Sequence, residues 1–217
     1  MNFKDKVIVI TGAGRGIGKS LADKFTQAGA QVVASDRADT DVRDEKAVIA
    51  LAEKTIQKFG RIDIWINNAG VLHNVDSNEE LLNMEKAHEV IDTNFFGTVF
   101  GCRTAIKYMK KVGDGVIINI LSTAALDATR AINTEIYAAS KWAVRGYLQA
   151  FKNENKDSGV LIYSVYPGGT KTELYRHEDK PASYNDYMDT DSVAEKIIVN
   201  FETENPEEEL VLRRPTA

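Results

Sequence analysis

A tyrosine and a lysine four residues apart, Tyr137 and Lys141, form the pair in this sequence best suited to acid–base chemistry. In a helix, residues at this spacing lie on one face, one turn from each other. A phenol has an ordinary pKa of about 10, and an ammonium about 4 Å away favours the phenolate by about 3 pKa units at most. The pair therefore predicts a tyrosine that exchanges a proton with an alcohol or a carbonyl. The same spacing also occurs in ordinary surface helices, so the pair alone does not decide the function.

A glycine-rich segment stands far upstream of this pair, between an apolar run at Val7–Ile10 and a helical pattern near Gly16–Ala28. Glycines allow a tight turn and a close approach of the backbone to a pyrophosphate, which then binds the amides at the positive end of the helix. The strand before and the helix after the segment favour a dinucleotide site over a loop without a ligand. The predicted contacts in this segment are Gly12, Arg15, Gly16, Ile17 and Gly18.

An acidic residue, Asp36, ends the second predicted strand a little more than twenty residues after the first glycine of the loop. A carboxylate at this place accepts hydrogen bonds from the adenosine ribose of NAD and repels the additional phosphate of NADP. Arg15 and Arg37 leave NADP open, because guanidinium groups pair well with phosphate. We expect NAD or NADP as the cofactor, with NAD favoured.

Composition restricts the class of protein. The chain has 217 residues, a net charge of -5 and 43% hydrophobic residues, which fits one globular domain and does not suggest a nucleic-acid-binding protein. Cys102 is the only cysteine, so no internal disulfide can form, and the apolar run near the start is too short for a leader or a membrane span. We expect a cytoplasmic protein with no membrane partner. The three histidines show no metal-ligand spacing, so no metal site is predicted.

Short apolar strands alternate with longer helical patterns along the whole chain. The expected strands are Val7–Ile10, Gln31–Ala34, Ile62–Ile66, Val116–Leu121, Leu161–Val165 and Leu210–Leu212. The expected helices are Gly16–Ala28, Glu45–Phe59, Glu85–Lys111, Ile136–Glu154 and Ser192–Phe201. This alternation predicts a single α/β domain, a doubly wound parallel sheet with helices on both faces and ligands beyond the carboxyl ends of the strands. Two segments, Ser35–Asp44 and Glu173–Asp189, are expected to be irregular.

Taken together, these motifs make the chain resemble the short-chain dehydrogenase/reductase family, which has a Rossmann-like fold. The family's motifs occur here in order: the glycine loop, Asn67-Asn68-Ala69-Gly70, Asn94, Ser122, Tyr137 with Lys141, and Pro167-Gly168-Gly169-Thr170-Lys171-Thr172. They extend from residue 7 to residue 172, and the ending from Leu210 to Pro215 also resembles the last strand of some members.

The resemblance implies catalytic roles for four residues. Tyr137 is expected to be the acid/base, Lys141 to lower its pKa and bind the nicotinamide ribose, and Ser122 to bond the substrate oxygen. Asn94 is expected to hold a water that links Lys141 to solvent. Taken singly, Ser122 could instead be a strand-end hydroxyl in a turn, and Asn94 a helix residue bonded to backbone.

The resemblance also implies the remaining cofactor contacts. Asn68, Ala69 and Gly70 are expected along the adenosine side, and Asp41 and Val42 at the adenine. Thr170 and Thr172, in the segment that begins with Pro167 and Gly168, are expected to hold the carboxamide, although Thr172 could instead cap a helix.

Three departures from the family pattern carry structural expectations. Only four residues separate Asp36 from Asp41, so the sheet edge there should be trimmed. Ser122 and Tyr137 are fifteen positions apart, so the loop Leu126–Glu135 should bulge over the site, with Thr123 replacing Ser122 if the register differs. The short segment Glu173–Asp189 is expected to form a small lid, or a solvated connector, that Tyr175, Tyr184, Tyr187 and Met188 could line.

The sequence thus predicts an NAD(P)-dependent oxidoreductase that interconverts a secondary alcohol and a ketone. A carbonyl or 3-oxoacyl reductase using NADPH is the alternative within the enzyme class, and a dinucleotide-binding regulator without turnover is the alternative outside it. The resemblance further implies a homodimer or homotetramer formed through the helices Glu85–Lys111 and Ile136–Glu154, with the final strand contributing to a second contact.

Overall fold

A six-stranded parallel sheet forms the centre of the molecule in a computed structural model that describes residues 1–73, 83–129, 131, 133–174 and 180–214. Its strands are β1 (Val7–Thr11), β2 (Gln31–Ser35), β3 (Ile64–Asn67), β4 (Gly115–Ile120), β5 (Val160–Pro167) and β6 (Glu209–Leu212). Within the described residues their order is β2-β1-β3-β4-β5-β6, so the direction of winding reverses between β1 and β3. The expected doubly wound α/β fold is confirmed, and the reversal marks where such folds bind ligands.

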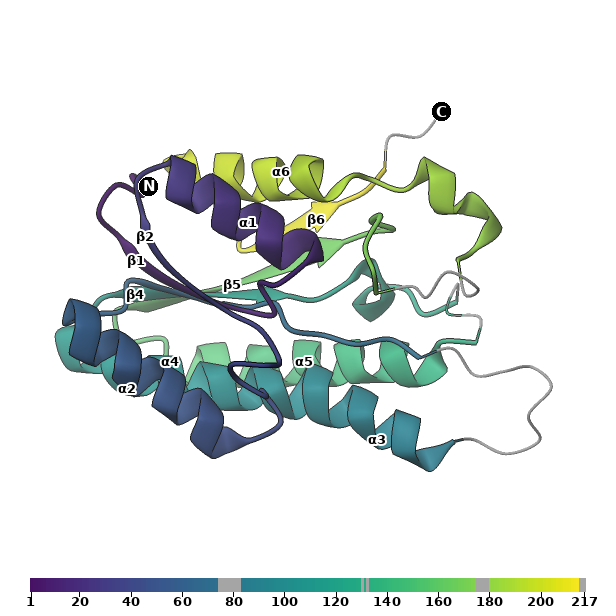
Figure 1. Cartoon of the computed structure of the whole chain (residues 1–217), viewed down its shortest axis with the longest axis horizontal. Helices are drawn as coiled ribbons and strands as arrows, with labels where there is room; N and C mark the ends of the chain where they lie inside the picture. Colours follow the sequence, from purple (N-terminus) through teal and green to yellow (C-terminus); the bar gives the residue numbers. More distant parts are fainter. Residues whose placement is uncertain (74–82, 130, 132, 175–179, 215–217) are drawn as a thin grey trace.

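Two layers of helices cover the sheet (Figure 1). One face carries α1 (Gly16–Gln27) and α6 (Thr190–Glu202), and the other carries α2 (Glu45–Phe59), α4 (Gly97–Val112) and α5 (Glu135–Glu154). Each layer encloses its own apolar core. None of the helices in the described part of the chain is both long and apolar enough to cross a lipid bilayer.

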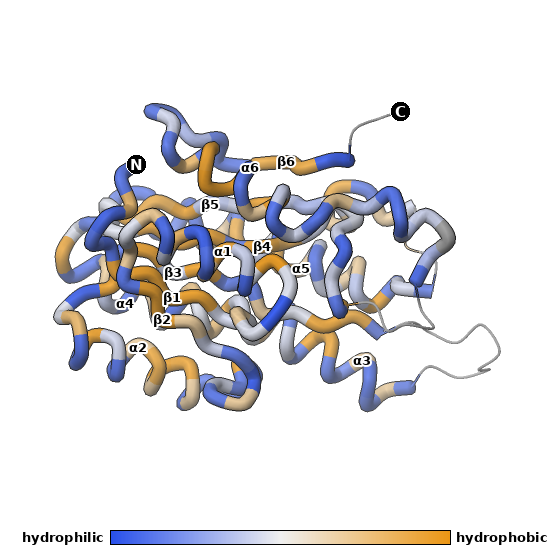
Figure 2. The backbone as a smooth tube through the Cα atoms, turned by 45° about the horizontal axis from the view of Figure 1, so that its top comes forward, coloured by the Kyte–Doolittle hydropathy of each residue, from blue (hydrophilic) through white to orange (hydrophobic). Residues whose placement is uncertain are grey.

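Alternation of side chains along the central strands fills both cores at once. In β1, Ile8 and Ile10 belong to the core beneath α1 and α6, whereas Val9 belongs to the core on the opposite face. Trp65 of β3 likewise faces the opposite core from Ile64 and Ile66. Figure 2 shows these strands as the hydrophobic centre of the chain. Burial on both faces explains why these strands are continuous apolar runs.

The sheet ends at β2, as the short spacing after Asp36 predicts. Residues 36–44 form turns, in which the Thr40 amide donates to the Asp36 carbonyl at 2.8 Å. The chain then enters α2, where the Asp44 side chain accepts from the Lys46 amide as N-cap. β2 is therefore an edge strand, and its partly exposed side chains reflect that position.

The helix expected over Glu85–Lys111 contains an irregularity that periodicity did not predict. α3 (Met84–Ile91) runs into a π-helical turn, η1 (Asp92–Phe96), before α4 continues the same path. Two further short 3-10 segments, η2 (Thr123–Ala125) and η4 (Ala182–Asp186), were also not predicted. A π turn inserts one residue without breaking the helix, and no proline in Met84–Val112 marks a boundary, so the segment was predicted as one helix.

A buried polar cluster links β3, β4 and α4 beneath the sheet. Trp65 Nε1 donates to Asn67 Oδ1 at 2.8 Å, and Asn67 Nδ2 donates to Asn119 Oδ1 at 2.8 Å. Cys102 lies 3.3 Å from both amides, and its burial raises the pKa of the thiol far above the ordinary range. Cys102 is thus a packed, protonated residue of the core.

We predict that Gly101→Ala destabilises the protein by about 2–3 kcal/mol because of this cluster. A Cβ at residue 101 would lie 1.9 Å from Asn67 Oδ1 and 2.9 Å from Trp65 Nε1. Gly146→Ala is the matched control, because a Cβ there meets nothing within 4 Å and should add about 0.5–1 kcal/mol of helix stability. Urea unfolding of both variants measures the difference; equal stabilities would contradict the assigned packing.

Candidate active site

A cavity of about 1280 Å³ runs along the carboxyl ends of the strands, from the glycine loop after β1 to the residues after β6. All the predicted catalytic and cofactor residues line it except Gly18 and Asn94. Parallel strands bring their carboxyl ends to one edge of the sheet, so motifs far apart in sequence meet there.

The glycine loop has the geometry of a phosphate cradle. Gly12 has a φ of 65°, and a Cβ on it would lie 2.7 Å from Ala69 Cα. The N-cap residue of α1, Arg15, makes no side-chain capping bond, and the first turn of α1 contains no acidic residue. The amides at this helix start are therefore suited to an anion such as a pyrophosphate.

Gly18 has a packing role in the structure, and the cofactor contact expected for it stays a prediction. A Cβ there would lie 2.3 Å from Asn68 Nδ2 and 2.4 Å from the Gly12 carbonyl oxygen. Asn68 Nδ2 donates to that same carbonyl at 2.8 Å. The third glycine thus lets α1 pack closely against the turn that the other glycines form.

At the glycine-loop end of the cavity, the Asp36 carboxylate stands directly over the loop. Its Oδ2 would lie 2.6 Å from a Cβ on Gly14, and its Oδ1 accepts from the Ala38 amide at 2.8 Å. Asp41, also predicted at this end, is paired with Arg43 through Nε at 2.9 Å and Nη2 at 2.5 Å. This pairing holds the pKa of Asp41 below its ordinary value.

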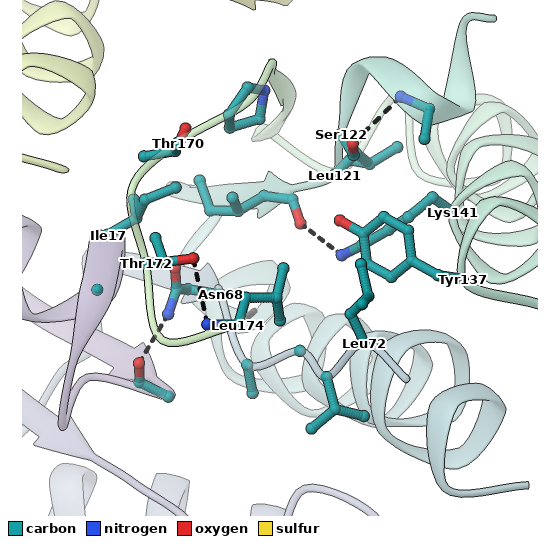
Figure 3. Close-up of a pocket in the computed structure, with 18 of the residues that line it drawn as sticks. Ile17, Asn68, Leu72, Leu121, Ser122, Tyr137, Lys141, Thr170, Thr172 and Leu174 are labelled. Atoms are coloured by element: carbon teal, nitrogen blue, oxygen red, sulfur yellow. Dashed lines mark hydrogen bonds between the residues drawn. The ribbon is translucent and has the colours of Figure 1, made fainter. Parts of the chain in front are cut away.

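At the opposite end, Tyr137 and Lys141 extend from α5 into the cavity, and Ser122 lies beyond the end of β4 (Figure 3). Lys141 is 5% exposed, and its Nζ donates to the Ile120 carbonyl at 3.1 Å. The same nitrogen lies 5.7 Å from the centroid of the Tyr137 ring. The helical spacing therefore does place the two side chains together, facing the end of β4.

The titration behaviour of this pair differs from the expectation. Burial raises the pKa of Tyr137, and the nearby Ser122 hydroxyl opposes the rise only in part. Burial also lowers the pKa of Lys141 to about 8. The predicted lowering of the pKa of Tyr137 by Lys141 is thus not what this structure shows, because desolvation dominates for both groups.

Asn94 lies in the π turn and is fully buried, without direct access to the cavity. Its Oδ1 accepts from the Val71 amide at 2.8 Å, and its Nδ2 donates to the Val71 carbonyl at 2.9 Å and to Ser140 Oγ at 3.0 Å. This side chain therefore fastens the segment after β3 to α5. The water-holding role expected for it stays a prediction, and the backbone-bonded alternative describes its side-chain contacts.

Ser122 also makes the turn contact considered for it, because its Oγ accepts from the Ala124 amide at 3.1 Å. This bond fixes the hydroxyl at the start of η2 without removing it from the cavity. Thr123 lines the cavity as well, and its Oγ1 would lie 3.8 Å from a Cβ on Gly168. Of the two hydroxyls, that of Ser122 opposes the rise in the pKa of Tyr137 that burial causes, which favours Ser122 over Thr123.

The segment after β5 forms the remaining wall. Thr170 Oγ1 donates to the Gly168 carbonyl at 2.9 Å, and Thr172 Oγ1 accepts from the Leu174 amide at 3.3 Å. Thr170 also pairs with Met188 in an isolated β-bridge, which attaches the returning chain to this wall. Figure 3 shows Thr170 and Thr172 across the cavity from Tyr137, close to Ile17 of the glycine loop.

The loop expected to bulge over the site does contribute to it, through Leu126, Asp127, Ala131 and Thr134. Of the four residues proposed to line a lid, Tyr187 lines the cavity, whereas Met188 is buried in the core beneath α6. Tyr184 is not among the lining residues and donates to the Thr172 carbonyl at 3.3 Å. Tyr175 lies outside the described residues, and a lid function stays a prediction.

Sequence reasoning missed several lining residues. The most informative are Leu72, Thr93, Arg43, Arg213 and Arg214. The two arginines follow β6, which pairs in parallel with β5 so that Leu212 lies opposite Pro167. The parallel arrangement alone could have placed them at this edge, because every strand's carboxyl end lies there.

Comparison with known proteins agrees with this arrangement. The family model described as short chain dehydrogenase matches residues 6–40 and 37–182. The chain belongs to the short-chain dehydrogenase family. Members of this family are oxidoreductases that use NAD or NADP, which confirms the resemblance and the coarse activity predicted from the motifs.

Individual members of the family show how similar the chain is. It is 35% identical over 193 residues to a cyclohexanol dehydrogenase of Acinetobacter sp., covering 79% of this chain and 76% of that relative. The crystal structure of 3-ketoacyl-(acyl-carrier-protein) reductase from Brucella melitensis complexed with NADH matches with a TM-score of 0.85 at 27% identity, covering 97% of this chain and 96% of that one. ElxO with NADP bound matches with a TM-score of 0.82 at 28% identity, covering 97% of both chains.

We predict that Lys141→Met stabilises the fold at pH 7 by about 1–3 kcal/mol, because it removes a buried charge. Unfolded, the lysine keeps its proton up to its ordinary pKa of 10.5; folded, it loses the proton near pH 8. Between these values the unfolded chain binds more protons, so the wild type gains stability as pH rises. Urea unfolding at pH 7 and pH 10 should show the gap between variant and wild type shrinking.

Lys110→Met is the matched control for this measurement, because Lys110 is an exposed lysine on α4. Its unfolding free energy should follow that of the wild type at both pH values. A Lys141→Met variant that is less stable than the wild type at pH 7 would contradict the assigned cost of burying the ammonium.

Proposed function

We propose that this chain is a secondary-alcohol dehydrogenase and ketone reductase that prefers NAD and uses Tyr137 as its acid/base. One observation carries the proposal: a single cavity has Asp36 over a phosphate cradle at one end and Tyr137, Lys141 and Ser122 together at the other. An extended dinucleotide lying along this cavity would bring its reactive ring to the tyrosine.

The residues that would hold the dinucleotide follow the cavity wall. The helix start at Gly16 and Ile17 suits the pyrophosphate, and Asp36 suits the adenosine ribose hydroxyls. Asn68, Ala69 and Gly70 would contact the adenosine side, with Asp41 and Val42 at the adenine and Thr170 and Thr172 at the carboxamide. When bound, the dinucleotide supplies or accepts the hydride.

Tyr137 would move the proton of the substrate oxygen. With its pKa raised by burial, the phenol is protonated at neutral pH and is ready to donate to a carbonyl oxygen that becomes an alcohol. The Lys141 ammonium would stabilise the phenolate that remains, and Ser122 would donate to the same substrate oxygen and orient it. Asn94 would support a water connecting Lys141 to solvent.

The substrate is proposed to be small and largely apolar near the reacting carbon. Leu72, Leu126, Leu174 and Tyr187 line the cavity around the catalytic end. A cyclohexanol dehydrogenase and a diacetyl reductase among the relatives act, by their names, on small alcohols or ketones. Both observations support a compact alcohol or ketone as substrate.

A 3-oxoacyl or other carbonyl reductase is the second candidate. Arg213 and Arg214 line the cavity and could attract an anionic carrier group. A ketoacyl reductase is also among the structural neighbours. Short ketones tested beside acyl thioesters distinguish the two candidates by relative kcat/KM.

We predict that Tyr137→Phe lowers kcat at least 1000-fold while the Kd for NADH changes less than threefold, because only the proton donor is removed. Ketone reduction followed at 340 nm and calorimetric titration with NADH measure the two quantities. Tyr147→Phe, on the same helix, is the control and should retain turnover. Full activity of Tyr137→Phe would contradict the mechanism, and a wild type that binds NADH without turning over any carbonyl would favour a regulator.

We also propose a homo-oligomer formed through α4 and α5. Phe96, immediately before α4, is 43% exposed, and Trp142 of α5 is 44% exposed. Such exposure is large for aromatic side chains and is typical of a surface that another protein chain covers. Light scattering should give at least twice the chain mass, and Trp142→Glu should reduce it. A monomeric wild type would contradict this proposal.

A further inference from the structure

A carboxylate just outside the cavity, Glu89 on α3, contacts three side chains from two other segments, the turns between β2 and α2 and the chain after β3. Its Oε1 accepts from Arg37 Nη1 at 2.8 Å and lies 3.9 Å from Arg43 Nη1. Its Oε2 lies 2.7 Å from His73 Nε2. The contacts with His73 and Arg37 lower the pKa of Glu89, so it is ionised at neutral pH.

Within this group, Arg37 is the residue best placed to contact the cofactor. It follows Asp36 directly and lines the adenosine end of the cavity, with its side chain 64% exposed. An arginine at this place can pair with the 2′-phosphate of NADP. Here its guanidinium is instead bonded to Glu89, whose side chain is only 24% exposed.

The second arginine at this end is held even more firmly. Arg43 makes a bidentate pair with Asp41 and also lies near Glu89. The attraction of Asp41, and to a lesser degree of Glu89, raises the pKa of Arg43 above its ordinary value. Both cations are thus turned towards carboxylates of the protein, while the Asp36 carboxylate stands over Gly14.

We propose that Glu89 is a specificity-determining residue that favours NAD by holding Arg37 against α3, away from the place of a 2′-phosphate. The assignment rests on the proposed function, because it concerns the same dinucleotide site. A 2′-phosphate next to Asp36 needs a compensating cation, and Arg37 can supply it only by leaving Glu89. That exchange removes the Arg37 hydrogen bond from a carboxylate that is only 24% exposed, and this cost offsets part of what the phosphate contact gains.

The first test is Glu89→Gln, which keeps the side-chain shape and removes the charge. With Arg37 released, the ratio of Kd for NADPH to Kd for NADH should fall about tenfold, and Kd for NADH should stay within twofold. Glu85→Gln is the matched control, because Glu85 is an exposed residue in the first turn of the same helix. It removes the same charge without touching Arg37, and its ratio should equal that of the wild type. An unchanged ratio in Glu89→Gln overturns the proposal.

The second test does not depend on how well Glu89→Gln folds. Arg37→Ala alone should leave the ratio within twofold of the wild type, because Arg37 is already withheld from the phosphate. In the double variant Arg37→Ala with Glu89→Gln, the fall in the ratio should disappear. A ratio that rises severalfold in Arg37→Ala, or a fall that persists in the double variant, overturns the assignment of Glu89 while NADH binding still supports the proposed function. A wild type that binds neither dinucleotide refutes both.

Discussion

The buried ammonium of Lys141 is the constraint around which the catalytic end is organised. Its Nζ donates to the Ile120 carbonyl at the end of β4. That bond requires α5 to pack directly over the strand end. Asn94 reinforces the arrangement by bonding both the segment after β3 and Ser140 of α5. Asn94 lies in the π turn, a less stable form of helix than the α-helix. This turn places the Asn94 side-chain amide between the segment after β3 and α5.

The other end of the cavity lies at the same edge of the sheet, but there the controlling constraint is close packing of the backbone. Glycines at the turn after β1 let α1 approach Asn68 and Ala69 to distances that no side chain permits. Charged groups are then arranged on the surface of this frame, with Asp36 over the loop and two arginines paired to carboxylates. Rigid packing would therefore place the cofactor of the proposed function, and the surface ion pairs would influence which cofactor fits.

Sequence reasoning was most successful where one residue type is physically required. The apolar runs of β1 and β4, the helix α2 between Asp44 and Gly60, and the spacing of Tyr137 and Lys141 all carry local signals that tertiary packing did not override. The trimmed sheet edge also followed from counting residues after Asp36. The packing role of Gly18 was not predicted, because a glycine required for packing and one required by a ligand look identical in sequence.

The remaining features depend on contacts between distant segments. The π turn is not marked by any helix-breaking residue in the sequence. Glu89 looks like an ordinary helix-surface acid in the sequence, and only the fold shows its contacts with Arg37 and His73. The pKa of Tyr137 could not be inferred from its distance to a lysine, since burial of both groups outweighs their attraction. The balance between burial and charge attraction, which sets the pKa of each group in the cavity, can be judged only once the fold is known.

Calorimetric titration of the wild-type protein with NADH and with NADPH, at the same moderate ionic strength, tests the central claim most directly. The account predicts that both dinucleotides bind at one site per chain and that NADH binds more tightly, because Asp36 faces the ribose and Arg37 is held by Glu89. Tighter binding of NADPH would contradict the roles given to Asp36 and Glu89. Absence of binding by either dinucleotide would contradict the reading of the whole cavity.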